Sequence, residues 1–207
     1  FRSCENLTAI NCRLDTSSVT NEISQIFIGC VNLEYVDATN LVGSNIKYAS
    51  GLFSSCTLLK QIDGLNTWDT GEVTGFTSMF QSCGSLTSLS GIERWNVGKV
   101  KAMDNFISKC TSLTGELNLS NWNISNCVNF ASAFRETGLT EINLTNWSPT
   151  TANTNMANMF RDSSSMSKLI APTLVNSNVN GLSYFLNNCS SLTSIDVSQW
   201  DVSGSKV

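Results

Sequence analysis

Met79-Phe80-Gln81-Ser82-Cys83-Gly84-Ser85-Leu86-Thr87-Ser88-Leu89 recurs with variations along the whole 207-residue chain. A phenylalanine marks each copy, and successive markers lie roughly 26 residues apart. A constant period of about 20–50 residues is typical of a solenoid, in which each repeat packs mainly on its two neighbours. The eight markers are Phe1, Phe27, Phe53, Phe80, Phe106, Phe134, Phe160 and Phe185.

Composition and charge narrow the class of protein. The chain is 41% hydrophobic with two prolines, which excludes a disordered polypeptide. A net charge of −4 without a basic cluster argues against nucleic acid as a partner. Because no apolar run approaches the length of a membrane span, we expect membrane attachment only through segments absent from this chain. Residues 1–207 are predicted to form a single solenoid domain, a fragment of a longer protein.

The half of each repeat that follows the phenylalanine predicts a short strand. Leu192, Ile195, Val197 and Trp200 fit a leucine-rich template, and several other copies match it. In two neighbouring copies, Gly64 and Gly91 are extra residues, which indicates a bulge or bend. Stacking of these strands in successive turns predicts a parallel sheet.

The half that precedes the phenylalanine predicts a short helix. Val73, Phe76, Met79 and Phe80 share one face at helical spacing, and other copies keep a similar pattern. We therefore predict an α/β repeat fold, a leucine-rich-repeat solenoid of about eight turns, each with one short parallel strand and one short helix.

The recurring order of Met-Phe, Cys, Leu and Trp resembles the BspA-like leucine-rich repeat of surface proteins from bacteria and some mucosal protists. The resemblance covers nearly the whole chain. It implies a bacterial, surface-displayed adhesive protein, located at the cell surface or outside the cell. Some copies depart from the pattern: the first, second and seventh lack Trp, and Thr137 and Ser164 replace the cysteine in the sixth and seventh.

Eight cysteines raise the question of disulfides or a metal. Six of them, Cys4, Cys30, Cys56, Cys83, Cys110 and Cys189, share one repeat position, where parallel inward side chains give poor disulfide geometry. We expect all eight, including Cys12 and Cys127, to be buried, reduced and inert. One or two disulfides between repeats are the alternative. Without His or a C-x-x-C pair, no zinc site is predicted, and no other metal or cofactor is expected.

The five tryptophans also have two interpretations. Trp68, Trp95, Trp122, Trp147 and Trp200 could form a surface on which sugars stack. The template places an inward-facing residue at this position, which favours a ladder in the core instead.

The outward strand positions form the candidate ligand-binding face. Its residues are Tyr35, Asp37, Gln61, Asp63, Glu116, Asn118, Glu141, Asn143 and Lys168. Such faces bind partners in many repeat proteins. The alternative is a solvated polar face that only keeps the sheet soluble. A calcium ion between Asp37 and Asp63 is a further alternative, although no calcium-binding loop surrounds them.

No catalytic motif accompanies this face. The chain has no His, nucleophile elbow, phosphate-binding loop or dinucleotide fingerprint, so we predict that it is not an enzyme and has no catalytic residues. The favoured function is an adhesin-like binding module for a host or microbial surface protein or glycan. The alternative is a structural spacer or assembly module of a surface layer or a phage tail appendage.

Overall fold

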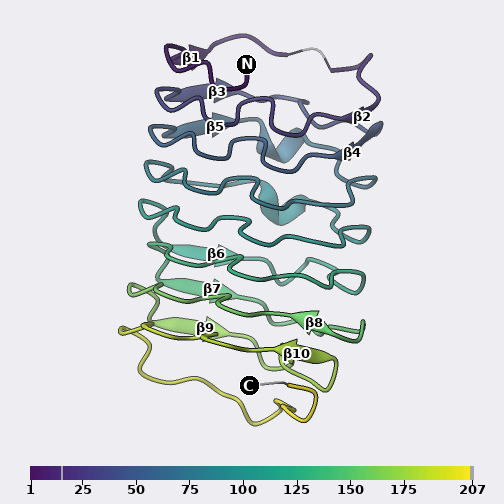
Figure 1. Cartoon of the computed structure of the whole chain (residues 1–207), viewed down its shortest axis with the longest axis vertical. Coiled ribbons are helices and arrows are strands. Elements are labelled where there is room, and N and C mark those ends of the chain that lie inside the picture. Colours follow the sequence, from purple (N-terminus) through teal and green to yellow (C-terminus); the bar gives the residue numbers. More distant parts are fainter. Residues whose placement is uncertain (15, 206–207) are drawn as a thin grey trace.

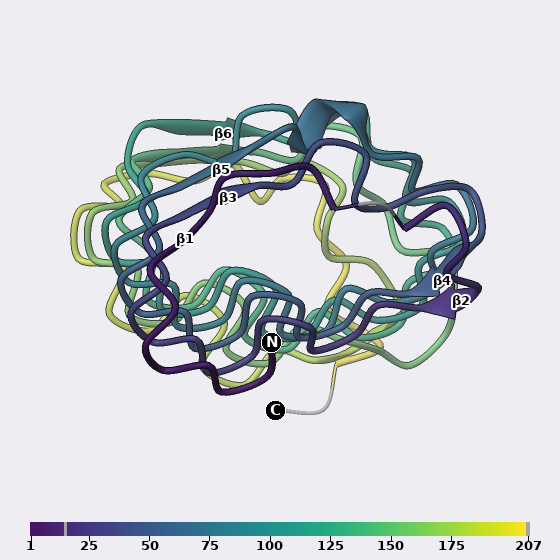
Figure 2. The same cartoon turned by 90° about the horizontal axis from the view of Figure 1, so that it is seen from above.

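Successive copies of the repeat stack as the coils of a parallel β-solenoid (Figure 1). The computed structural model describes residues 1–14 and 16–205. The repeat solenoid is confirmed, but it has about seven turns instead of the predicted eight. Eight markers enclose seven intervals, which explains the difference. Seen from above, each coil is an oval ring around a central core (Figure 2).

One side of the oval carries the strands that the template predicted. They form two separate sheets, β1-β3-β5 and β6-β7-β9, with every pair parallel. Their bounds are β1 (Ala9–Ile10), β3 (Tyr35–Asp37), β5 (Gln61–Asp63), β6 (Glu116–Asn118), β7 (Glu141–Asn143) and β9 (Lys168–Ile170). The central residue of each three-residue strand points into the core, so its two neighbours point outward.

A second line of pairing runs along another part of the oval. Here β2 (Asn21–Glu22) pairs with β4 (Ile46–Tyr48), and β8 (Thr154–Asn155) pairs with β10 (Val179–Gly181). Single bridges join Tyr48, Gly75, Ala102, Asn129 and Asn155 in turn, so the ladder continues between the two sheets.

The predicted helix of each turn is wrong: no α-helix occurs in residues 1–14 and 16–205. Around Phe80 the chain forms overlapping turns, with N–H groups bonded to carbonyl groups three residues earlier. Ser78 and Ser82 have φ values of 55° and 61°, which a right-handed helix cannot contain. The alternate N–H groups, including that of Phe80, donate to the next coil instead.

The hydrogen bonds between coils also correct the repeat register. The N–H of Phe80 donates to the carbonyl of Phe106, and the N–H of Ile107 donates to that of Ala133. Ile107, and not Phe106, therefore occupies the position of Phe80, and the same pattern of bonds places Leu186 instead of Phe185 at this position. The shift explains why Phe80 meets Phe106 edge-on at 73°, although it stacks on Phe53 at 5°.

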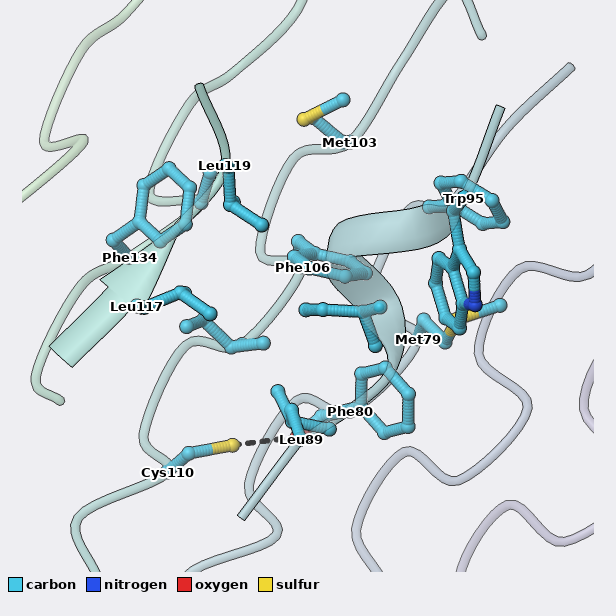
Figure 3. Packing of buried hydrophobic residues seen from close by; sticks show 14 of the residues in the cluster. Met79, Phe80, Leu89, Trp95, Met103, Phe106, Cys110, Leu117, Leu119 and Phe134 are labelled. Atoms are coloured by element: carbon cyan, nitrogen blue, oxygen red, sulfur yellow. Dashed lines mark hydrogen bonds between the residues drawn. The ribbon is translucent and has the colours of Figure 1, made fainter. Parts of the chain in front are cut away.

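Corrected in this way, the cysteine position always lies three residues after the phenylalanine position. Cys83 donates its thiol hydrogen to the carbonyl of Phe53 at 3.1 Å, and Cys110 bonds that of Phe80 at 3.1 Å (Figure 3). Ser163, and not Ser164, takes this place in its coil, and its hydroxyl donates to the Phe134 carbonyl at 2.8 Å. The side chains of Cys83, Cys110 and Ser163 thus tie their coils to the preceding ones.

The expectation that all eight cysteines are buried is only partly correct. Cys30, Cys56, Cys83, Cys110 and Cys127 are buried and Cys189 is half-buried, whereas Cys4 and Cys12 are exposed in the first coil. All eight are free thiols in the described structure. Burial raises the pKa of Cys110 to about 12, because the thiolate would lose its hydration.

The tryptophans form a ladder in the core. Trp68 and Trp95 stack at 5.1 Å between ring centroids, and Trp95 is 4% exposed. Its indole N–H donates to the Leu65 carbonyl of the preceding coil at 2.9 Å, and the other four tryptophans make equivalent bonds. Trp200 is half-buried, whereas the other four rings are buried, so sugars cannot stack on those four.

Two glycines shape the interruption between the strand sheets. Gly64 and Gly91 adopt left-handed conformations and precede the 3₁₀ helices η1 (Leu65–Thr67) and η2 (Ile92–Arg94). A Cβ on Gly64 would lie 2.5 Å from the Thr39 Cα, and one on Gly91 would lie 2.7 Å from the Asn66 nitrogen. Both coils bend where the sequence predicted a bulge, because only glycine allows this close approach.

Substitution of Gly64 by alanine should lower the free energy of unfolding by about 2–4 kcal/mol, through backbone strain and collision together. Gly115→Ala separates the two causes, since Gly115 has a φ of 82° but no atom within 4 Å of the added Cβ. It should cost about 1–2 kcal/mol. Gly43→Ala causes neither backbone strain nor a collision, so it should leave the free energy of unfolding nearly unchanged. Urea unfolding of the three variants checks this order, and equal effects would refute the close approach at Gly64.

Candidate functional site

The strand face consists of the outward side chains of β1, β3, β5, β6, β7 and β9, together with those of residues 87–90 between β5 and β6. The register brings the predicted residues together in two groups. Tyr35 lies beside Gln61 and Asp37 beside Asp63 in one group, and Glu116, Glu141 and Lys168 follow one another in the other. Asn118 and Asn143 are paired in the second group. The nine residues therefore share a side of the solenoid, but they do not form one continuous sheet (Figure 1).

Three of the nine residues bond to their own backbone. The side-chain oxygens of Asp37, Asn118 and Asn143 accept hydrogen bonds from N–H groups two residues further along the chain, at 3.1 Å in each case. The bonds from Thr39 to its carboxylate lower the pKa of Asp37. These side chains close the turn at the end of each strand, a role that the D/N-x-S/T pattern could have indicated.

The longer side chains of β3 and β5 form hydrogen bonds within a strand and between neighbouring coils. The Tyr35 hydroxyl donates to Asp63 Oδ2 at 2.9 Å, and Gln61 Nε2 donates to Asp63 Oδ1 at 2.8 Å. The hydrogen bond to Asp63 raises the pKa of Tyr35. Because both oxygens of Asp63 already accept protein donors, the arrangement offers little to a calcium ion shared with Asp37.

Pairs of opposite charge add to these contacts. Lys168 Nζ lies 2.7 Å from Glu141 Oε1, and Lys60 Nζ lies 2.7 Å from Glu34 Oε2. All four side chains keep access to solvent, so each pair contributes at most about 1 kcal/mol. Glu116 differs, since no hydrogen bond or ion pair engages its carboxylate within the described structure.

The centre of the strand face is hollowed. The Thr87 N–H donates to the Lys60 carbonyl just before this point. Among the described residues, no backbone hydrogen bond then joins residues 88–90 to β5 or β6. An open hollow of about 410 Å³ lies on the β5 side, lined by Gln61, Asp63, Ser88 and Ser90 among others. A second hollow, of about 280 Å³, lies on the β6 side and includes Glu116 and Asn118.

The sequence pattern gave Ser88 and Ser90 no special role, because it predicted a bend at Gly91 but not the loss of sheet pairing at residues 88–90. Its extra Gly91 was the available signal. Leu89 is nevertheless 4% exposed and points into the core beside Leu117, as the template predicted (Figure 3). The residues on either side of Leu89 therefore face outward without being held in a sheet.

Other types of site find no support in the described residues. No group of three or more His, Cys, Asp or Glu side chains is arranged to hold a metal ion there. None of the described helices is long and apolar enough to cross a membrane. The geometry of the strand face, with polar side chains around open hollows, is suited to hydrogen bonding and ion pairing with a partner.

The fold and this face define a parallel β-solenoid repeat protein. A family model described as "Mycoplasma protein of unknown function, DUF285" matches residues 1–88, 49–173 and 150–206. The chain belongs to this family. The matched ranges overlap, as expected for a motif that recurs along the chain. No curated protein and no solved structure matches the chain.

Proposed function

We propose that this solenoid is a non-enzymatic binding module that recognises a protein or glycan partner through its strand face. The central hollows carry the proposal, because they interrupt an otherwise regular surface. Gly64 and Gly91 hold the two bends beside them at positions where a larger residue would collide with the preceding coil. The glycines therefore shape this part of the face specifically, whereas general solubility would need only polar side chains.

In the cell, this binding module would serve as an adhesin-like segment of a protein displayed on a bacterial surface. It draws on the BspA-like pattern of Met-Phe, Cys, Leu and Trp described above. The rigid stack of coils also favours it, since hydrogen bonds between coils present the face in one conformation. Binding by such a preorganised face loses little conformational entropy.

A binding screen tests this function. The purified protein is immobilised and exposed to matrix proteins, a glycan array and whole cells. Asp63→Lys should weaken saturable binding at least ~10-fold, because it reverses a charge within the central hollow and releases Tyr35 and Gln61. Glu22→Lys makes the same charge change on β2, away from the strand face (Figure 2), and should leave binding unchanged.

Two results would overturn the proposal. Binding that survives Asp63→Lys and is lost in Glu22→Lys would assign recognition to another side of the solenoid. No binding to any probe, together with concentration-dependent self-association in sedimentation experiments, would favour the alternative function, a spacer or assembly module.

A further inference from the structure

The hollows on the strand face result from the length of the side chains around them. Gln61 and Asp63 of β5 lie on one side, and Glu116 and Asn118 of β6 lie on the other. Between them, the equivalent outward positions carry only Ser88 and Ser90. The bond from Thr87 to Lys60 fixes this alignment, since it places residue 88 opposite Gln61. A shorter side chain in the middle coil leaves a depression between two taller rows.

Glu116 lies at the edge of this depression, and its carboxylate has no hydrogen-bond or ion-pair partner among residues 1–14 and 16–205. Its neighbour in register, Glu141, has the same charge and already binds Lys168 Nζ at 2.7 Å. Like charges directly opposite each other in a sheet are unfavourable, so a cation beside Glu116 would relieve the repulsion. On the other side of Glu116 the equivalent position is Ser88, which cannot supply a cation.

The protein itself shows which group fits such a position. Where a lysine follows a glutamate in adjacent coils, the two form an ion pair: Lys60 with Glu34 and Lys168 with Glu141. Glu116 has Glu141 instead of a lysine in the following coil, and the open space beside its carboxylate is the hollow on its other side, next to Ser88. The second acidic group of the hollow, Glu93, is already engaged, since its Oε2 accepts the Gly91 N–H at 2.7 Å.

We propose that the hollow on the β6 side, between residues 87–90 and β6, receives a lysine or arginine side chain from a partner protein, with its cationic group on the Glu116 carboxylate. This inference rests on the proposed binding function and specifies the partner's chemistry. The hydroxyls of Thr87, Ser88 and Ser90 provide acceptors for the remaining N–H donors of such a side chain. The net charge of −4 also favours encounter with a basic segment.

The test uses the isotope-labelled 207-residue chain and two blocked pentapeptides, Gly-Ser-Arg-Ser-Gly and its counterpart with glutamine in place of arginine. Titration of the arginine peptide should shift the backbone amide signals of residues 61–64, 87–90 and 116–118. The glutamine peptide should shift them much less. Glu116→Gln should weaken arginine-peptide binding ~5-fold, as expected for a solvent-accessible ion pair.

Two further variants separate the hollow from general charge attraction. Ser88→Gln introduces the side chain found at Gln61, fills the hollow without changing charge, and should also weaken binding. Glu22→Gln removes one charge from an exposed residue of β2 and should have no effect. Circular dichroism and thermal unfolding establish that each variant is folded.

The outcomes distinguish this inference from the proposed function. If Glu116→Gln and Glu22→Gln weaken binding equally, the peptide is attracted only by the overall negative charge of the protein. That result would overturn the proposal that the hollow binds a lysine or arginine side chain. If a partner from the binding screen depends on Asp63 but not on Glu116 or Ser88, the strand face binds and this assignment of its hollow is wrong. A neutral glycan that competes with the partner at Ser88 would also overturn it.

Discussion

Above about pH 9 the folded protein should lose stability steeply, by about 4 kcal/mol for each pH unit from three buried thiols alone. Burial raises the pKa of Cys56, Cys110 and Cys127 to about 12. In the unfolded chain these thiols ionise near their ordinary pKa of about 8.5. The folded state therefore holds protons that the unfolded state has released. The stabilisation is complete below about pH 8.5 and disappears as the pH approaches 12.

Urea unfolding in the presence of a reducing agent, at pH 7.5, 9 and 10, measures this loss. Cys110→Ser is the matched variant, because Ser163 shows that a hydroxyl fits the same position. Its stability should fall less steeply with pH than that of the natural chain, by about 1.4 kcal/mol for each unit. Parallel curves for the two proteins would mean that Cys110 is not buried as a neutral thiol. Lysine and tyrosine titration is common to both proteins and cancels in the comparison.

Phe80→Ala is expected to lower the free energy of unfolding by about 3–5 kcal/mol. The ring is fully buried, stacks on Phe53 at 5.7 Å and meets the edge of Phe106 at 5.6 Å. Its removal leaves a cavity between coils that hydrogen bonds hold at a fixed spacing, so the neighbours cannot close over it. Because each coil packs only on its neighbours, hydrogen exchange should accelerate most in the coils on either side of Phe80.

Phe1→Ala is the control for this substitution. Phe1 occupies the same repeat position but is 54% exposed, so its removal should cost less than about 1 kcal/mol. Chemical denaturation of both variants compares them directly. Similar losses in the two variants would contradict the assignment of Phe80 to a shared interior.

The sequence predicted the strands well because their signal is simple. Alternation around Ile62 and Ile142 places one residue in the core and two outside, and stacking at a constant period sets the parallel register. Gly64 and Gly91 were recognised as bends. The actual loss of sheet pairing around Ser88 depends on contacts between coils, which a pattern within one repeat does not contain.

The helix prediction failed because overlapping turns can imitate helical spacing. Phe76, Met79 and Phe80 face the core at intervals of three and four, as they would on a helix. The decisive residues are Ser78 and Ser82, whose positive φ values reverse the chain. Asn158 and Asp162 repeat this arrangement two residues on either side of Phe160. Small or polar residues at both places were a signal for left-handed conformations that hydrophobic periodicity ignores.

For the candidate site, the sequence predicted which residues share an outward face but not the hydrogen bonds and ion pairs of their side chains. Asp63 and Glu116 both appeared as outward carboxylates in the same repeat half. The structure shows that Asp63 accepts bonds from Tyr35 and Gln61, whereas no side chain in the described part of the chain binds the Glu116 carboxylate. Tyr35 lies 28 positions before Asp63, so this contact depends on the register of the coils.

The most direct test of the fold is the scalar coupling across the hydrogen bond donated by the Phe80 N–H, measured by NMR on deuterated, isotope-labelled protein. The β-solenoid predicts a coupling from the Phe80 nitrogen to the carbonyl carbon of Phe106, one coil further along, across an N–O distance of 2.9 Å. An α-helix would place the acceptor four residues earlier, at Phe76. A coupling to Phe106 supports the parallel β-solenoid, and a coupling to Phe76 would contradict it.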